Sequence, residues 1–392
     1  MNNKPRINEL IGKILEFLGK EYVTFGKAHV RGLYAWLFIG IMAGAVAGIA
    51  FTANRSAGVV FMADRSVEAE FRRARVVSTG WSTWFVFPNW IFGGQYIAGD
   101  PSVELAPDGF HMAYTDHEIV GRTSISPVID RAWSPDGVNW TRIESILHGR
   151  PSYWDRWVET ADLIRLSNGT WRLYYSGYIP IPILGPADIG LAITNNPQPK
   201  NFVRYGRILQ RENNWLDKDA LYSPAVFKSG NTWYMIYTGW VISGPKAGIR
   251  LLGATSTNGL TWEKYKVAPV LEGPPLGLAW TRTGVAEAHI LVGTDGWFYL
   301  FFTGIVDEGA TQERNIGIAR SRNPFGPWDV NQNPIVPDTG SGWNHFVLAP
   351  TVELLEDHVK MWFLGLTPNE DAKVGYATSS WPLWTGRISP SP

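Results

Sequence analysis

The chain has 392 residues, with 35 Lys plus Arg and 35 Asp plus Glu, so its formal net charge is zero. Zero net charge argues against a nucleic-acid-binding protein, which normally carries a basic excess. The lack of Cys excludes disulfides, thiolate metal sites and a Cys nucleophile. The 20 Trp residues call for a repeated structural Trp, a sugar-stacking surface or a membrane-interface belt.

The first segment, residues 1–32, is expected to be a cytoplasmic leader. Residues 7–20 read INELIGKILEFLGK, in which the apolar residues follow helical spacing and the charged residues take the opposite side. This pattern predicts a short amphipathic helix lying in the lipid headgroup region. A helix that binds a partner protein is the alternative.

Residues 33–53 read LYAWLFIGIMAGAVAGIAFTA, without a single charge. An apolar stretch of about 20 residues is long enough to cross a bilayer as a helix. A cleaved signal peptide is the alternative, but the apolar core exceeds the usual ~7–15 residues of such peptides. Gly40, Gly44 and Gly48 would share one face of this transmembrane helix, where small residues let another membrane subunit approach closely.

Residues 54–94 are expected to be an aromatic-rich juxtamembrane linker. Within it begins an uncharged stretch, residues 76–99, which contains Trp81, Trp84 and Trp90. One interpretation places these Trp residues against the membrane surface or a partner. The other makes the stretch the first strand of the following domain, buried by the rest of it.

From residue 95 to residue 392 the sequence repeats. Its aromatic strands read HMAYTD, RLYYSG, YMIYTG, YLFFTG and KMWFLG, with successive reference aromatics 61, 62, 65 and 61 residues apart. Each is preceded by an apolar strand and followed by a third strand, a turn and a Trp-bearing strand. A repeat of about four strands is a propeller blade, so the sequence predicts an all-β, five-bladed β-propeller.

Most of the Trp residues recur at equivalent places in this repeat, which favours a structural role. Sugar stacking stays open for one or two members of the second set, which lies in loops leading into the inner strands. The first set is Trp140, Trp262 and Trp328, and the second is Trp154, Trp215, Trp280 and Trp343.

The repeat resembles the five-bladed glycoside hydrolases, which include arabinanases, β-xylosidases and invertase-like enzymes. Two short motifs carry the resemblance with the blade pattern: GDPSV at residues 99–103 and AEAHI at residues 286–290. The resemblance implies a glycosidic bond cleaved by two carboxyl groups, one protonating the leaving oxygen and the other attacking or activating water.

The resemblance also implies the positions of these groups. Asp100 matches the base or nucleophile on the inner strand of the first blade, and Glu287 matches the general acid three blades later. A further assisting Asp is expected one residue before the apolar centre of the third blade, where this chain has Ala225. Asp162 has that register one blade earlier, so it is the remaining candidate if the protein is active.

The missing Asp at Ala225, the span and the glycine face favour a catalytically degenerate propeller that serves as an accessory or assembly subunit of a membrane complex. The layout also resembles the propeller-bearing accessory subunit of a bacterial reaction-centre–light-harvesting complex. The alternatives are a membrane-tethered glycoside hydrolase acting on furanosides or xylosides, and a sugar-binding lectin.

The expected location is the bacterial inner membrane, with the N-terminus cytoplasmic and the propeller on the periplasmic side. Expected partners are membrane subunits, the lipid bilayer and carbohydrate, without nucleic acid. No cofactor or metal is expected, because the seven His residues show no paired ligand spacing.

Overall fold

The computed structural model describes residues 74–120, 124–180, 186–369 and 371–386. The predicted leader, the predicted span at residues 33–53 and its face of Gly40, Gly44 and Gly48 lie outside these residues. In the part of the chain that is described, no helix combines the length and the apolar character needed to cross a membrane.

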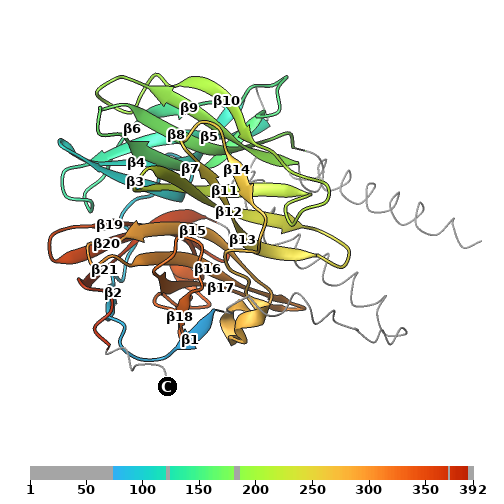
Figure 1. Ribbon diagram of the computed structural model, residues 1–392. Coiled ribbons are helices and arrows are strands. Elements are labelled where there is room, and N and C mark those ends of the chain that lie inside the picture. Colours follow the sequence, from blue (N-terminus) through green and yellow to red (C-terminus); the bar gives the residue numbers. More distant parts are fainter. Residues whose placement is uncertain (1–73, 121–123, 181–185, 370, 387–392) are drawn as a thin grey trace, which may run out of the picture.

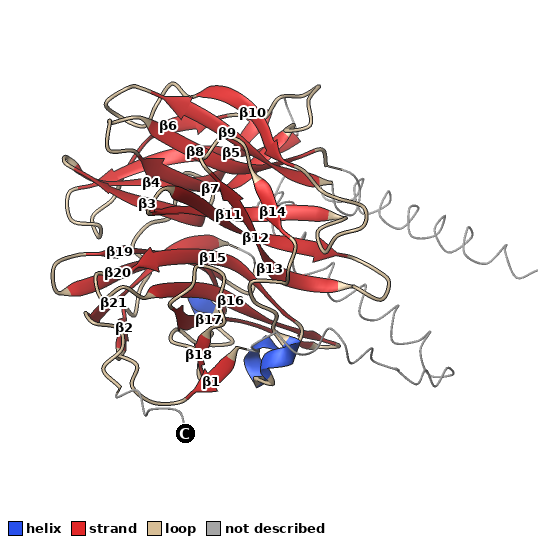
Figure 2. Ribbon diagram, viewed as in Figure 1, coloured by secondary structure: helices blue, strands red, loops and turns tan. Residues whose placement is uncertain are grey.

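The described chain is built almost entirely of strands, as Figure 2 shows. Blade I is β3 (Gly99–Ala106), β4 (Gly109–Val120), β5 (Ser124–Ser134) and β6 (Thr141–Leu147), and blade II is β7 (Trp157–Arg165), β8 (Trp171–Tyr178), β9 (Ala187–Thr194) and β10 (Val203–Leu209). Blade III is β11 (Ala220–Ser229), β12 (Thr232–Val241), β13 (Gly248–Ser256) and β14 (Glu263–Tyr265).

Blade IV is β15 (Gly284–Val292), β16 (Phe298–Glu308), β17 (Thr311–Ser321) and β18 (Asp329–Asn331), with β1 (Arg75–Val77) added parallel to β18. Blade V is β19 (Phe346–Leu354), β20 (His358–Leu366), β21 (Ala372–Ser380) and β2 (Trp84–Val86). Three short 3-10 helices are η1 (Pro274–Leu276), η2 (Ala279–Thr281) and η3 (Gly342–Asn344).

The first strands of the five blades contact one another in a closed cycle, β3 to β7, β11, β15, β19 and back to β3. Blades III and IV are joined into one sheet by a single parallel pair, Ile249 with Gly284. The all-β propeller predicted from the repeat is therefore confirmed, with the inner strands around the central axis.

Blade V closes the ring with strands from both ends of the described chain. Trp84, Phe85 and Val86 of β2 pair antiparallel with Ser379, Thr378 and Ala377 of β21 (Figure 1). Part of the expected linker, residues 54–94, is thus built into the propeller.

Of the three interface candidates, two pack inside this closing blade. Trp81 meets Trp384 edge to face at 5.0 Å, and Trp84 meets Phe301 at 5.7 Å between ring centroids. Trp90 is 48% exposed, with the Lys373 ammonium 5.6 Å from its ring centroid. The interpretation as a first strand buried by the domain therefore describes Trp84 better than a membrane contact does.

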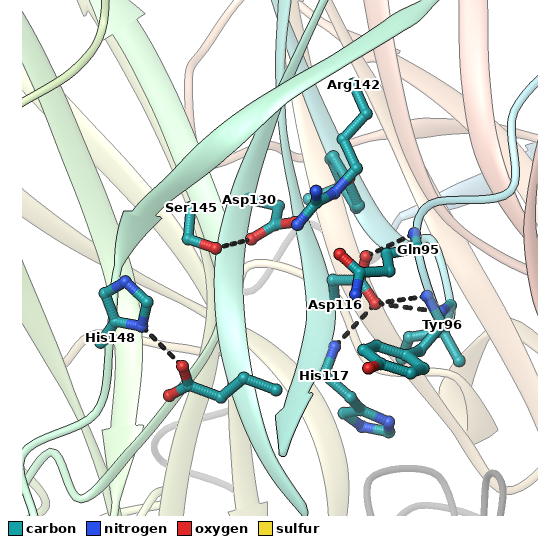
Figure 3. A network of polar contacts seen from close by, with 11 residues as sticks. Gln95, Tyr96, Asp116, His117, Asp130, Arg142, Ser145 and His148 are labelled. Atoms are coloured by element: carbon teal, nitrogen blue, oxygen red, sulfur yellow. Dashed lines mark hydrogen bonds and ion pairs between the residues drawn. The ribbon is translucent and has the colours of Figure 1, made fainter. Parts of the chain in front are cut away.

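A buried carboxylate fastens the segment that leads from blade V into blade I. Asp116 on β4 accepts hydrogen bonds from the backbone N–H groups of Gln95, Tyr96 and Ile97 at 2.7, 3.1 and 3.0 Å (Figure 3). Because a carboxylate satisfies several otherwise buried donors at once, this contact fixes the start of β3, where Asp100 lies.

The recurring Trp residues before the inner strands are packing elements. Trp154, Trp280 and Trp343 each stack on the reference aromatic of their own blade, with interplanar angles of 16–26°. A Cβ on Gly304 would lie 2.3 Å from the Trp280 ring, so this glycine makes room for the indole. The structural role predicted from their recurrence is confirmed for these three rings.

Candidate active site

All five inner strands carry the same irregularity. In each, the pairing register with the second strand shifts, and one residue at the shift has a positive φ of 46–51°. Left-handed backbone is uncommon for residues other than Gly, so its fivefold recurrence marks a β-bulge that belongs to the architecture. The bulge residues are Asp100, Thr160, Ser223, Glu287 and Ala349.

The five bulge residues line one central pocket of about 30 Å³. That space accommodates one or two water molecules, so a sugar ring would have to sit at its mouth. Only two of the five bulge side chains are carboxyl groups, Asp100 from blade I and Glu287 from blade IV. The structure thus places the two residues singled out from the sequence in the same pocket.

Asp100 is 5% exposed, and its two oxygens have different surroundings. Oδ2 accepts a hydrogen bond from the Thr115 hydroxyl at 3.0 Å, whereas Oδ1 is buried without a partner among the described residues. Burial, followed by the charges of Glu287 and Glu159, holds the pKa of Asp100 well above its usual range. An unpaired buried oxygen is costly and calls for a functional explanation.

Glu287 is also 5% exposed, and its hydrogen bonds converge on one oxygen. Oε2 accepts from the Thr303 hydroxyl at 2.9 Å and from the Ala349 N–H at 3.2 Å. Burial raises the pKa of Glu287, and the bond from Thr303 and the charge of Arg314 oppose that shift. Arg314 is itself held by two hydrogen bonds to Asp307 on β16.

Asp162 lines the same pocket, but both of its oxygens are occupied by neighbouring blades. Oδ1 accepts from the Ser102 hydroxyl of blade I at 3.2 Å, and Oδ2 accepts from the Val226 N–H of blade III at 2.7 Å. Burial raises its pKa to about 7. Asp162 therefore joins three inner strands, and this contact explains its presence without a part in chemistry.

Ala225 occupies the position equivalent to Asp162 in the next blade. Each is the first paired residue after its bulge, as are Ser102, His289 and Thr351 in the other blades. The Thr351 hydroxyl accepts from the Val103 N–H at 3.3 Å, so this ring of residues joins neighbouring blades in several places. Ala225 lacks the polar atoms for such a joint.

A third carboxyl group near the pair is Glu159, which the sequence reasoning missed. It directly precedes the bulge residue Thr160, is 9% exposed and accepts a hydrogen bond from the Tyr178 hydroxyl at 2.9 Å. Burial raises its pKa to about 7, and the charge of Glu287 contributes to that rise. Asp100, Glu287 and Glu159 thus form one electrostatic cluster.

The hydroxyls of Thr115 and Thr303 were also overlooked, although a signal was present. The aromatic strands read YT, YS, YT and FT at the same place, so a hydroxyl recurs directly after the reference aromatic. Among the described residues, no group of three or more His, Cys, Asp or Glu side chains is arranged to hold a metal ion.

Residues 94–367 match the family model described as glycosyl hydrolases family 43. No curated protein sequence matches the chain well enough to count as a relative. Several solved structures share its fold.

A structure titled glycoside hydrolase is 17% identical, with a TM-score of 0.59 over 82% of this chain and 94% of its own. The Cellvibrio cellulosa α-L-arabinanase complexed with arabinohexaose is 15% identical, with a TM-score of 0.52 over 74% and 92%. An exo-1,5-α-L-arabinanase from a bovine ruminal metagenomic library is 14% identical, with a TM-score of 0.52 over 72% and 92%. At these identities the likeness concerns the fold alone.

Proposed function

Because the chain belongs to the glycosyl hydrolases of family 43, we propose that it hydrolyses glycosidic bonds with Asp100 and Glu287 as the reacting carboxyl groups. The observation that carries this proposal is their shared pocket, in which two nearly buried carboxyl groups from blades I and IV raise the pKa of one another's neighbourhood. Glycoside hydrolysis requires such a pair on the two sides of the scissile bond.

The electrostatics suit a division of labour between the two groups. Like charges in one buried site resist simultaneous ionisation, so the pair tends to hold one proton. With that proton on Glu287, its carboxyl can protonate the leaving oxygen. Asp100, no longer facing a charged Glu287, can then ionise and attack the anomeric carbon or activate water.

Family membership corrects the interpretation favoured by the sequence. A catalytically degenerate accessory subunit rested on Ala225, at the place expected for an assisting Asp. The match over residues 94–367 supports the glycoside hydrolase alternative instead, and the photosynthetic resemblance finds no support. The buried Glu159 also shows that a third carboxyl group can reach the pair from another blade.

For the substrate we propose furanosides or xylosides. The two arabinanases among the similar structures support a pentose-containing substrate, and the narrow pocket supports a single sugar ring at its mouth.

The test is hydrolysis of aryl arabinofuranosides and aryl xylosides by the full-length protein. We expect Asp100→Asn and Glu287→Gln each to lower the rate by at least ~10²-fold, the lower range for losing acid–base catalysis. Asp357→Asn, at an exposed position of blade V, is the matched control and should keep full activity. A wild-type protein without turnover on the whole panel would contradict the proposal, as would a variant that keeps it.

We also propose that residues 33–53 anchor the chain in a membrane, with the propeller on the far side from the N-terminus. The uncharged 21-residue stretch supports this proposal. Alkaline carbonate extraction of membranes tests the anchor, and protease treatment of spheroplasts tests the side. Release of the intact chain by carbonate would exclude a span.

A further inference from the structure

Four of the five blades carry a hydroxyl at one position of their second strand. The position lies opposite the residue that precedes the bulge, as in the pairs Gly99 with Thr115 and Ala286 with Thr303. Blade V has Leu364 there, opposite Leu348. The four hydroxyl residues are Thr115, Ser176, Thr238 and Thr303.

Each of these hydroxyls accepts a hydrogen bond from the bulge N–H of the next blade. The distance is 3.1 Å from Thr160 to Thr115, and 3.0 Å from Ala349 to Thr303. The other two pairs are Ser223 to Ser176 at 3.1 Å and Glu287 to Thr238 at 2.9 Å.

These bonds dictate the direction of the hydroxyl proton. A backbone N–H can only donate, so the hydroxyl oxygen acts as acceptor toward the next blade and keeps its own proton for another partner. In blades I and IV that partner is the bulge carboxyl of the same blade. Thr115 donates to Oδ2 of Asp100 at 3.0 Å, and Thr303 donates to Oε2 of Glu287 at 2.9 Å.

We propose that Thr115 and Thr303 are positioning residues that select the reacting oxygen of each carboxyl group, Oδ1 of Asp100 and Oε1 of Glu287. This inference rests on the proposed hydrolase function. Oε2 of Glu287 accepts two hydrogen bonds, so the acid's proton belongs on Oε1. Oδ2 of Asp100 is occupied, whereas Oδ1 is unpartnered among the described residues.

The reaction then follows a defined route. The Oε1 proton moves to the glycosidic oxygen as the bond from that oxygen to the anomeric carbon breaks. Glu287 is left as a carboxylate, and the two bonds already made to Oε2 stabilise the new charge. Oδ1 of Asp100 supplies the electron pair, either to the anomeric carbon or to a proton of the attacking water.

The test compares Thr303→Val, which removes the hydroxyl, with Thr303→Ser, which keeps it. A hydrogen bond to the charged form favours that form, so its loss raises the pKa of Glu287. We expect Thr303→Val to lower kcat about 10- to 100-fold, the range for losing a hydrogen bond to a charged group, and to move the alkaline limb of the pH–rate profile upward. Thr303→Ser should restore both.

Ser176→Ala is the matched control, because Ser176 holds the same position in blade II but contacts Thr160 and Ser223 and neither carboxyl group. It should lower the melting temperature while leaving the pH limbs in place. An unchanged pH profile in Thr303→Val, or a Thr303→Ser variant that behaves like Thr303→Val, would overturn the proposal.

A titration without substrate separates this inference from the hydrolase proposal. The carboxyl signal of Glu287 in ¹³C-labelled full-length protein is assigned by its loss in Glu287→Gln. If wild type hydrolyses none of the glycosides, the hydrolase proposal fails, and the inferred reacting oxygens fail with it. If wild type is active but Thr303→Val titrates Glu287 at the wild-type pKa, only the positioning role fails.

Discussion

At the scale of single residues, the site depends on which side chain stands at a backbone position that all blades share. Asp100 and Glu287 could be predicted because each lies three residues before the apolar centre of its inner strand. This register is the bulge position. Thr160, Ser223 and Ala349 have the same backbone without a carboxyl group, so positive φ alone carries no chemistry.

Glu159 could not be predicted in the same way. It stands one residue before the bulge, opposite Ser176, where an alternating strand pattern assigns it to the interface between blades. Only the closed ring brings its carboxyl close enough for its charge to act on Asp100.

Removing the charge of Glu159 should therefore change the acidity of Asp100. We expect Glu159→Gln to lower the pKa of Asp100 and to shift the acidic limb of the pH–rate profile to lower pH, since the base must be ionised to act. The groups around Glu159 that must be tracked are Asp100, Glu287, Tyr178 and Tyr222. An acidic limb that stays in place would show that Glu159 does not act on the pair.

At the scale of strands, the joints between neighbouring blades explain why the assisting Asp was sought in the wrong role. Sequence register aligned Asp162 with Ala225, and the structure agrees that the positions are equivalent. The hydrogen bonds of Asp162 to Ser102 and Val226 cross between blades, and no pattern along one strand reveals such partners.

The joint at Asp162 should make stability depend on pH. Its pKa of about 7 lies above the ordinary 3.8, so the folded chain holds a proton that the unfolded chain releases as pH rises between these values. Stability is then lost as pH rises, by up to about 4 kcal/mol for this group. We expect the melting temperature to fall from pH 5 to pH 8, and to fall less in Asp162→Asn.

The exposed Asp357 provides the control for this pH dependence. Asp357→Asn should keep the wild-type difference between pH 5 and pH 8. Equal differences in Asp162→Asn and wild type, measured by calorimetry, would mean that Asp162 is ionised in the folded protein at both pH values.

At the scale of the whole molecule, the ring is closed by β2, a three-residue strand that the sequence left inside an expected linker. Five aromatic strands at regular spacing predicted the blades, because each blade repeats the same packing. The closing strand breaks the repeat, since it comes from the other end of the chain and carries no blade motif.

Cross-linking this closure should stabilise the ring. Phe85 on β2 lies directly opposite Thr378 on β21, a spacing that suits a disulfide, and the chain has no Cys of its own. We expect oxidised Phe85→Cys with Thr378→Cys to exceed its reduced form by about 2–4 kcal/mol. Each single Cys variant serves as control, and no difference between the two redox forms would mean that β2 does not limit unfolding.

The position of β2 also has a consequence for how the protein is made. Residues 84–86 are synthesised early, but their partners at residues 377–379 leave the ribosome almost last. Blade V therefore cannot be completed during most of translation, and the seam between β19 and β3, beside Asp100, is the final one to close. Synthesis itself delays assembly of the pocket, so truncated chains that lack β21 are left with an open ring and unpaired strand edges, which favour aggregation.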